Sequence, residues 1–148
     1  LAHKASHEGV MVANLIAGKD PIPVNKASIA NCTYSYPEIA SIGLTEQQAI
    51  DKKIKINIGN FPLIGNGKAV VLDDTDGFIK TIYNAETGEL LGAHMIGPNV
   101  TELIGSYAIG LGLEITDEDF VHTILPHPTL SEAIHESALD ALGKAIHI

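Results

Sequence analysis

The chain has 148 residues, of which 45% are hydrophobic, enough for the core of one domain of ordinary size. Its formal net charge is -9, and nine lysines with no arginine supply all the positive charge. Because there is no basic stripe, we expect no nucleic-acid partner. No apolar run approaches the ~20 residues of a membrane span, so we expect no membrane partner. The single cysteine, Cys32, excludes an internal disulfide and makes a cytoplasmic setting the default.

Periodic apolar residues, separated by turn and capping signals, divide the chain into short helices and strands. Residues 21–26 and 65–67 are expected to be loops, and residues 84–88 carry the turn chemistry of a hairpin. In chain order we expect helices at 2–17, 46–53, 100–111, 117–122 and 130–142, capped where possible by Thr45, Asn99, Thr116 and Thr129, and strands at 28–34, 39–44, 54–58, 78–83 and 90–96.

Five strands grouped between flanking helices predict an α+β domain with an antiparallel β-sheet. The first expected helix, at 2–17, is set apart from the strand region by the connector at 21–26. We therefore expect residues 21–148 to form this domain and residues 1–20 to be a terminal helix that continues from a domain outside the chain. Because the sequence starts at Leu1 rather than at a methionine, we also expect the chain to be a fragment of a longer protein.

The common motifs of cofactor and metal sites are absent from the sequence. There is no G-x-G-x-x-G after a strand, no phosphate-binding loop, no G-x-S-x-G turn, and neither H-E-x-x-H nor C-x-x-C. We therefore expect no bound nucleotide and no metal site. His135 is expected to be a solvated helix residue, and the terminal His147 to be exposed or disordered. The candidate metal ligands that fit no standard zinc spacing are His122, His127, Glu132, His135 and Glu136.

The stretch LPHPTLSEAIHES, residues 125–137, holds the candidate functional residues. Thr129 and Glu132 match the capping box T-x-x-E, in which Glu132 accepts from the N–H of Thr129 and His127 is an ordinary loop residue. In the alternative interpretation, Glu132 fixes the tautomer of His127 and favours the protonated ring, while Pro126 and Pro128 restrict the backbone. This second interpretation predicts a general base, although the chain contains no nucleophile beside it.

The residues HPTLSEA, at 127–133, resemble the C-terminal signature of the dihydrolipoyl dehydrogenase family, flavoproteins of the pyridine nucleotide-disulfide oxidoreductases. Three positions depart from the family pattern: Leu125 and Tyr36 stand where histidine is frequent, and Lys68 stands where arginine is common. The other stretches that resemble the family, in the same order along nearly the whole chain, are LAHKA at 1–5 with Glu8 and Gly9, TYSYPEIASIG at 33–43, DTDGFIK at 74–80 and LGAHMIGP at 91–98.

This resemblance implies that residues 1–20 continue from an FAD-binding domain and that residues 21–148 are the dimerisation domain of a homodimer. It implies that His127, oriented by Glu132, acts as a base in the partner subunit's active site, where thiols exchange. There the dihydrolipoyl groups of 2-oxo acid dehydrogenase complexes would be oxidised with FAD and NAD+, so lipoyl domains are expected partners. The chain alone is expected to bind no cofactor and to be inactive. The implied cofactor contacts are Leu1, Ala2, His3, His127 and Pro128.

Two alternatives stay open beside this one. The chain could belong to another disulfide reductase of the same family, such as glutathione reductase, although Ala133 after Glu132 favours the lipoyl enzyme. It could also be a self-association module without chemistry of its own. Because relatives often have cis bonds at the matching positions, we expect cis peptides at Tyr36-Pro37 and His127-Pro128.

Overall fold

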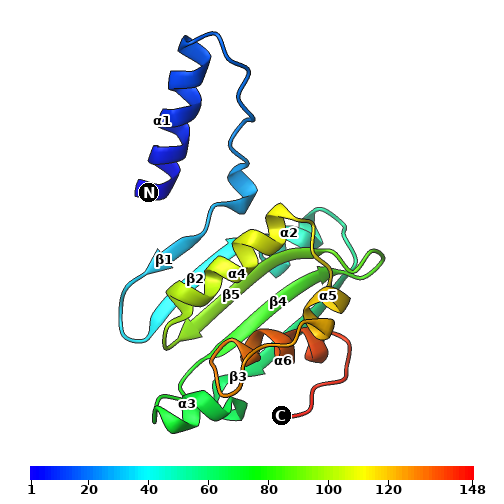
Figure 1. Ribbon diagram of the computed structural model, residues 1–148. Coiled ribbons are helices and arrows are strands. Elements are labelled where there is room, and N and C mark those ends of the chain that lie inside the picture. Colours follow the sequence, from blue (N-terminus) through cyan, green and yellow to red (C-terminus); the bar gives the residue numbers. More distant parts are fainter.

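Five antiparallel strands form one sheet, in the order β1-β2-β5-β4-β3, in the computed structural model, which describes residues 1–148 (Figure 1). The predicted α+β class and the five antiparallel strands are confirmed. The strands are β1 (Asn31–Thr33), β2 (Glu38–Gly43), β3 (Ile56–Pro62), β4 (Phe78–Asn84) and β5 (Leu90–Gly97).

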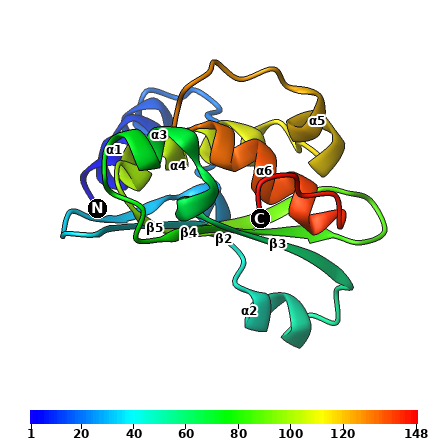
Figure 2. The same cartoon turned by 90° about the horizontal axis from the view of Figure 1, so that it is seen from below.

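Most helices cover one face of this sheet. Figure 2 shows α4, α5 and α6 above the sheet and α2 on the opposite face. The core lies between the sheet and the helix layer, where Tyr83 of β4, Tyr107 of α4 and Ile134 of α6 are buried. The α-helices are α1 (Ala2–Ile16), α2 (Glu46–Asp51), α3 (Gly67–Val71), α4 (Val100–Gly112), α5 (Asp117–His122) and α6 (Glu132–Ala141), and the 3-10 helices are η1 (Lys26–Ser28) and η2 (Leu63–Gly65).

The first helix, α1, stands apart from the sheet beyond the β1 edge (Figure 1). None of its residues is buried, and it makes no substantial contact with any other helix or strand. Its apolar side chains Val10, Leu15 and Ile16 are exposed. The domain boundary near residue 20 stays a prediction, but α1 contributes nothing to the core of the sheet domain.

The expected boundaries were wrong in three regions. The strand expected at 28–34 is limited to Asn31–Thr33, because only these residues pair with β2. The strand expected at 54–58 instead runs from Ile56 to Pro62, because β4 supplies pairing partners over these residues. Of the loop expected at 65–67, only Asn66 lies outside η2 and α3, two helices that are too short to show a sequence period.

Several capping predictions are confirmed. Thr45 and Thr116 each form a capping box at the start of their helices. Gly143 follows α6 with φ +67, the left-handed conformation that glycine adopts at low cost. Asn99 precedes α4 as expected, but its side chain makes no capping bond. The peptides before Pro37 and Pro128 are both cis, as expected. None of the helices has the length and apolar character needed to cross a membrane.

Candidate active site

The segment from 123 to 131 connects α5 to α6 and carries His127 between two prolines. Leu130 is buried and Leu125 packs against the core, so apolar side chains fix the segment on both sides of His127. The His127 side chain is 77% exposed. The segment therefore presents its imidazole at the surface of the protomer.

The Glu132 carboxylate holds His127 and the loop backbone at the same time. Its Oε1 lies 2.8 Å from Nδ1 of His127, and its Oε2 accepts from the backbone N–H of Thr129 at 2.8 Å. An ionised carboxylate can only accept, so the proton of this pair is on Nδ1 and the lone pair of the neutral ring is on Nε2. The carboxylate thus makes both of the contacts that the two interpretations of the sequence required.

The prediction that Thr129 is the N-cap of the last helix is wrong. The helix α6 begins at Glu132, and the residue before it, Ser131, makes no side-chain capping bond. The Thr129 hydroxyl instead donates to the carbonyl of Pro126 at 2.7 Å. Of the two contacts of a capping box, only the one between Glu132 and the Thr129 N–H is present. The Thr129 hydroxyl instead closes the turn around His127.

The Glu132 carboxyl is charged, as an acceptor of two hydrogen bonds requires. Partial burial raises the pKa of its carboxyl, but the Thr129 N–H and the His127 imidazole lower it, and the resulting pKa lies below the ordinary value. The group is therefore ionised at neutral pH. A negative charge beside Nδ1 stabilises the imidazolium that forms when Nε2 takes up a proton.

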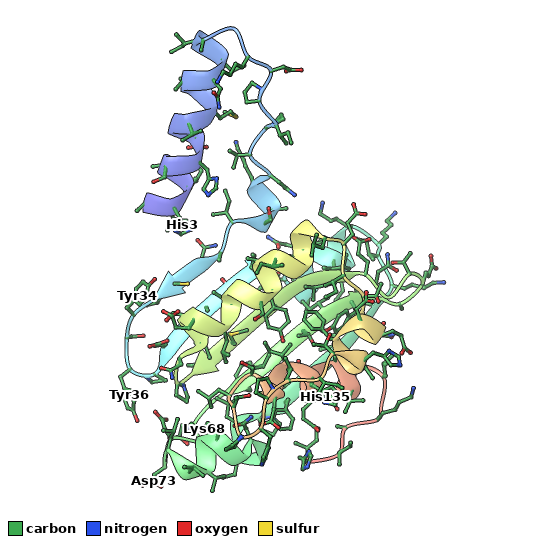
Figure 3. The ribbon with its side chains drawn as sticks, in the orientation of Figure 1. His3, Tyr34, Tyr36, Lys68, Asp73 and His135 are labelled. Carbon is green, nitrogen blue, oxygen red and sulfur yellow. The ribbon has the colours of Figure 1, made fainter.

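A cleft of about 590 Å³ lies beside this pair. It is bounded by the 121–127 segment, the first turns of α6, the C-terminal residues and the loop before α3. His135, labelled in Figure 3, lines the cleft from α6, and its Nε2 lies 3.2 Å from the carbonyl of Val121. His135 is therefore only partly exposed and bonded, rather than solvated as expected.

A second histidine–glutamate pair borders the same cleft, and the sequence did not reveal it. Oε1 of Glu136 lies 2.7 Å from Nδ1 of His147, and Oε2 accepts from the backbone N–H groups of Ile146 and His147. Burial raises the pKa of Glu136, but these hydrogen bonds lower it below the ordinary value. The terminal His147 is exposed as expected, yet it is held in place. Its partner lies 11 residues away in sequence, so no local pattern announces the pair.

Three of the predicted cofactor contacts lie away from this cleft. Leu1, Ala2 and His3 are exposed at the start of α1, and Nε2 of His3 lies 2.9 Å from the carbonyl of Ala30 (Figure 3). In one protomer these residues are far from the loop of His127, across the sheet (Figure 1). Pro128 is exposed directly after His127. The cofactor contacts of all these residues stay predictions.

The chain brings no nucleophile or metal site to the cleft. No three of its His, Cys, Asp and Glu side chains are grouped so that they could hold a metal ion. The single thiol, Cys32, is on β1, at the opposite edge of the sheet from β3. Burial raises the pKa of the Cys32 thiol, and the nearby Glu38 raises it further, so the thiol is protonated at neutral pH. The exposed His127 thus has no thiol beside it in its own chain.

Several curated proteins resemble this chain closely. Proteins named dihydrolipoyl dehydrogenase from Zymomonas mobilis, Rhizobium etli and Bacillus subtilis are 53%, 47% and 47% identical, each over 99% of this chain. The chain spans about a third of the length of these relatives, 32%, 31% and 31% respectively.

Solved structures share the fold. The crystal structure of LpdA from Mycobacterium tuberculosis superposes with a TM-score of 0.86 at 26% identity, over 93% of this chain and 30% of that chain. The flavoprotein disulfide reductase RclA from Escherichia coli gives a TM-score of 0.77 at 22% identity, over 83% of this chain and 28% of that chain, and shows the fold alone.

The sheet with its helix layer and the loop of His127 lie almost wholly within one family match. Residues 29–138 match the family model described as the pyridine nucleotide-disulphide oxidoreductase dimerisation domain. This match covers well over half of the chain, and the chain therefore belongs to the dimerisation-domain family of the pyridine nucleotide-disulphide oxidoreductases.

Proposed function

We propose that the protein containing this chain is a dihydrolipoyl dehydrogenase, in which the chain supplies the dimerisation domain and a His127–Glu132 base. The observation that carries the proposal is the geometry of this pair. Nδ1 is bound by an ionised carboxylate, while Nε2 has no partner within the chain and the side chain is 77% exposed. Relatives with that name, at 47–53% identity, support the same assignment.

The base acts on thiols. Nε2 of His127 takes the proton from a dihydrolipoyl S–H, and the resulting thiolate attacks one sulfur of a redox disulfide. A new S–S bond forms, the old one breaks, and the released sulfur leaves as a thiolate. The second dihydrolipoyl sulfur then displaces the first enzyme sulfur, leaving a lipoyl disulfide and an enzyme dithiol. Since Cys32 has no cysteine partner, the redox disulfide comes from outside this chain.

When bound, FAD and NAD+ accept the two electrons that thiol oxidation releases. The start of α1 suits a contact with FAD, because Leu1 is 60% exposed and the first turn contains no acidic residue. We therefore assign Leu1, Ala2 and His3 to the flavin site, and residues 1–20 to the FAD-binding domain. His127 and Pro128 would reach that site from the other protomer.

A homodimer makes these assignments compatible. Within one protomer the start of α1 and the His127 loop are separate and both exposed, so a site that uses both must be completed by a second copy (Figure 1). Membership of a dimerisation-domain family supports this arrangement. The proposed partners beyond the dimer are the lipoyl domains of 2-oxo acid dehydrogenase complexes, in a cytoplasmic setting.

The test is NAD+-linked oxidation of dihydrolipoamide by the full-length protein. His127→Gln should lower turnover by about 10²–10⁴-fold, as expected for a lost general base. His122→Gln is the matched control, because His122 has the same exposed fraction, 77%, and its own glutamate neighbour, Glu118. An unchanged rate in His127→Gln would exclude the role. Faster reduction of glutathione disulfide than oxidation of dihydrolipoamide would favour the glutathione reductase alternative.

A further inference from the structure

We infer that Asn66, on the loop before α3, is a positioning residue that holds the His127–Glu132 base in its working geometry. This inference rests on the proposed function, because it concerns the same base. Asn66 does not contact the reacting atoms. It acts through the backbone of Thr129, and it is 63 residues away from Thr129 in the sequence.

The segment that carries His127 is not held by backbone pairing. No backbone–backbone hydrogen bond involves residues 124–129. Within the segment, side-chain bonds run only from His127 and Thr129 to Glu132 and from Thr129 to Pro126. The one hydrogen bond that joins the segment to a distant part of the chain runs from Nδ2 of Asn66 to the carbonyl of Thr129, at 3.1 Å.

Asn66 is built to be rigid. Asn66 is 3% exposed, and its Oδ1 accepts from the N–H of Ala69 at 2.9 Å, capping α3. Its own N–H donates to the carbonyl of Leu63 at 2.9 Å, and its carbonyl accepts from Val70 at 3.1 Å. With the backbone and Oδ1 fixed, the direction of Nδ2 is fixed as well, so the amide can act as a stable anchor.

The anchor connects to the imidazole through two further contacts. Both backbone polar groups of Thr129 are hydrogen-bonded: its carbonyl accepts from Asn66, and its N–H donates to Oε2 of Glu132. The other oxygen of that carboxylate binds Nδ1 of His127. Without the Asn66 amide, the Thr129 carbonyl loses its partner and the loop is free to turn it toward water. Glu132 then loses a fixed donor, and the ring loses its direction.

A purely structural alternative is that Asn66 only caps α3. Asn66→Ser separates the two roles, because a serine hydroxyl also caps helices but is too short to reach Thr129. Asn66→Asp is the second variant: it keeps the size and the cap but replaces the donor by an acceptor. Asn25→Ser is the matched control, since Asn25 caps η1 through Ala27 at 3.0 Å and has no side-chain bond to the His127 loop.

The experiment uses the full-length protein and two measurements. The first is turnover with dihydrolipoamide and NAD+, which should fall about 10- to 100-fold in Asn66→Ser and Asn66→Asp and should not change in Asn25→Ser. The second is NMR of isotope-labelled histidine, in which the His127 ring-nitrogen signals should shift in both Asn66 variants. A residue that only capped α3 would leave those signals unchanged.

A double mutant then tests whether Asn66 acts through Glu132. In a Glu132→Gln background, Asn66→Ser should cause little further loss, because contacts in one network are not additive. Wild-type turnover and unshifted His127 signals in folded Asn66→Ser would overturn the inference, as would a full additional loss in the double mutant. If His127→Gln were itself without effect, the proposed function would fail, while the NMR signals would still decide whether Asn66 positions the ring.

Discussion

The carboxylate of Glu132 binds Nδ1 of His127 with one oxygen and the backbone N–H of Thr129 with the other, both at 2.8 Å. A single side chain therefore fixes both the ring and the loop that carries it. The two contacts also lower the pKa of Glu132 against the opposing effect of partial burial. The orientation of the proposed base depends on this bidentate arrangement.

Glu132→Gln should lower turnover of the full-length protein by about 10- to 100-fold. The two contacts use different oxygens of Glu132, and in a carboxamide one of these atoms becomes an NH2 donor, so one of the two acceptors is lost. Amide hydrogen exchange at Thr129 or the His127 NMR signals should report which contact is lost. Glu118→Gln is the control, because the exposed Glu118 carboxylate lies 3.5 Å from His122 and accepts from no backbone N–H. Equal rates in the two variants would contradict the prediction.

The buried Glu136 should make stability sensitive to acid. Burial raises the pKa of its carboxyl, but hydrogen bonds from His147 and Ile146 lower it below its ordinary value of 4.5. For a lowered folded-state pKa, the stabilisation is fully present above the unfolded value and is lost as the pH falls through the folded value. Glu136→Gln should therefore cost about 1–3 kcal/mol at pH 7, and the cost should shrink as the pH falls below 4.5.

Denaturant unfolding at a series of pH values measures this difference. A gap between wild type and Glu136→Gln that stays constant from neutral to acid pH would show that the carboxylate does not contribute through its charge. Glu86→Gln is the control, because Glu86 is 67% exposed and pairs with Lys55 at the surface, where ion pairs contribute about 0–1 kcal/mol.

The close approach of β3 and α6 should make Gly59 intolerant of a side chain. A Cβ at Gly59 would lie 1.8 Å from the carbonyl oxygen of Ser137 on α6. Gly59→Ala should push α6 from the sheet and destabilise the protein by about 1–3 kcal/mol. Gly67→Ala, where a Cβ meets nothing within 4 Å, should be close to neutral. Thermal unfolding of both variants checks the pair, and equal melting temperatures would count against the packing described.

Two buried tyrosines, Tyr83 of β4 and Tyr107 of α4, should respond differently to removal of the hydroxyl. Tyr107 Oη lies 3.2 Å from Ser137 Oγ, whereas Tyr83 Oη has no partner with hydrogen-bond geometry. Burial raises the pKa of both phenols far above the ordinary value. Tyr107→Phe should cost about 1 kcal/mol, and Tyr83→Phe should be neutral or stabilising. Denaturant unfolding of the two variants measures the difference, and a larger loss in Tyr83→Phe would contradict it.

The sequence alone determined the local elements. The hairpin turn between β4 and β5 and the capping residues Thr45 and Thr116 are short-range signals that the structure confirms. These signals are reliable because the hydrogen bonds that produce them join residues only a few positions apart in the sequence. The residues of the proposed base could also be named, because His127 and Glu132 lie five residues apart in one recognisable stretch.

Only the tertiary structure decided how that base is held. The helix α6 begins at Glu132 rather than after Thr129, because the Thr129 hydroxyl donates to the carbonyl of Pro126. The helix α3, capped by Asn66, is too short to show a helical period in the sequence. The links from Asn66 to Thr129 and from Glu136 to His147 join segments that meet only after folding. Local sequence patterns record hydrogen bonds between near neighbours, whereas these contacts depend on which distant segments the core brings together.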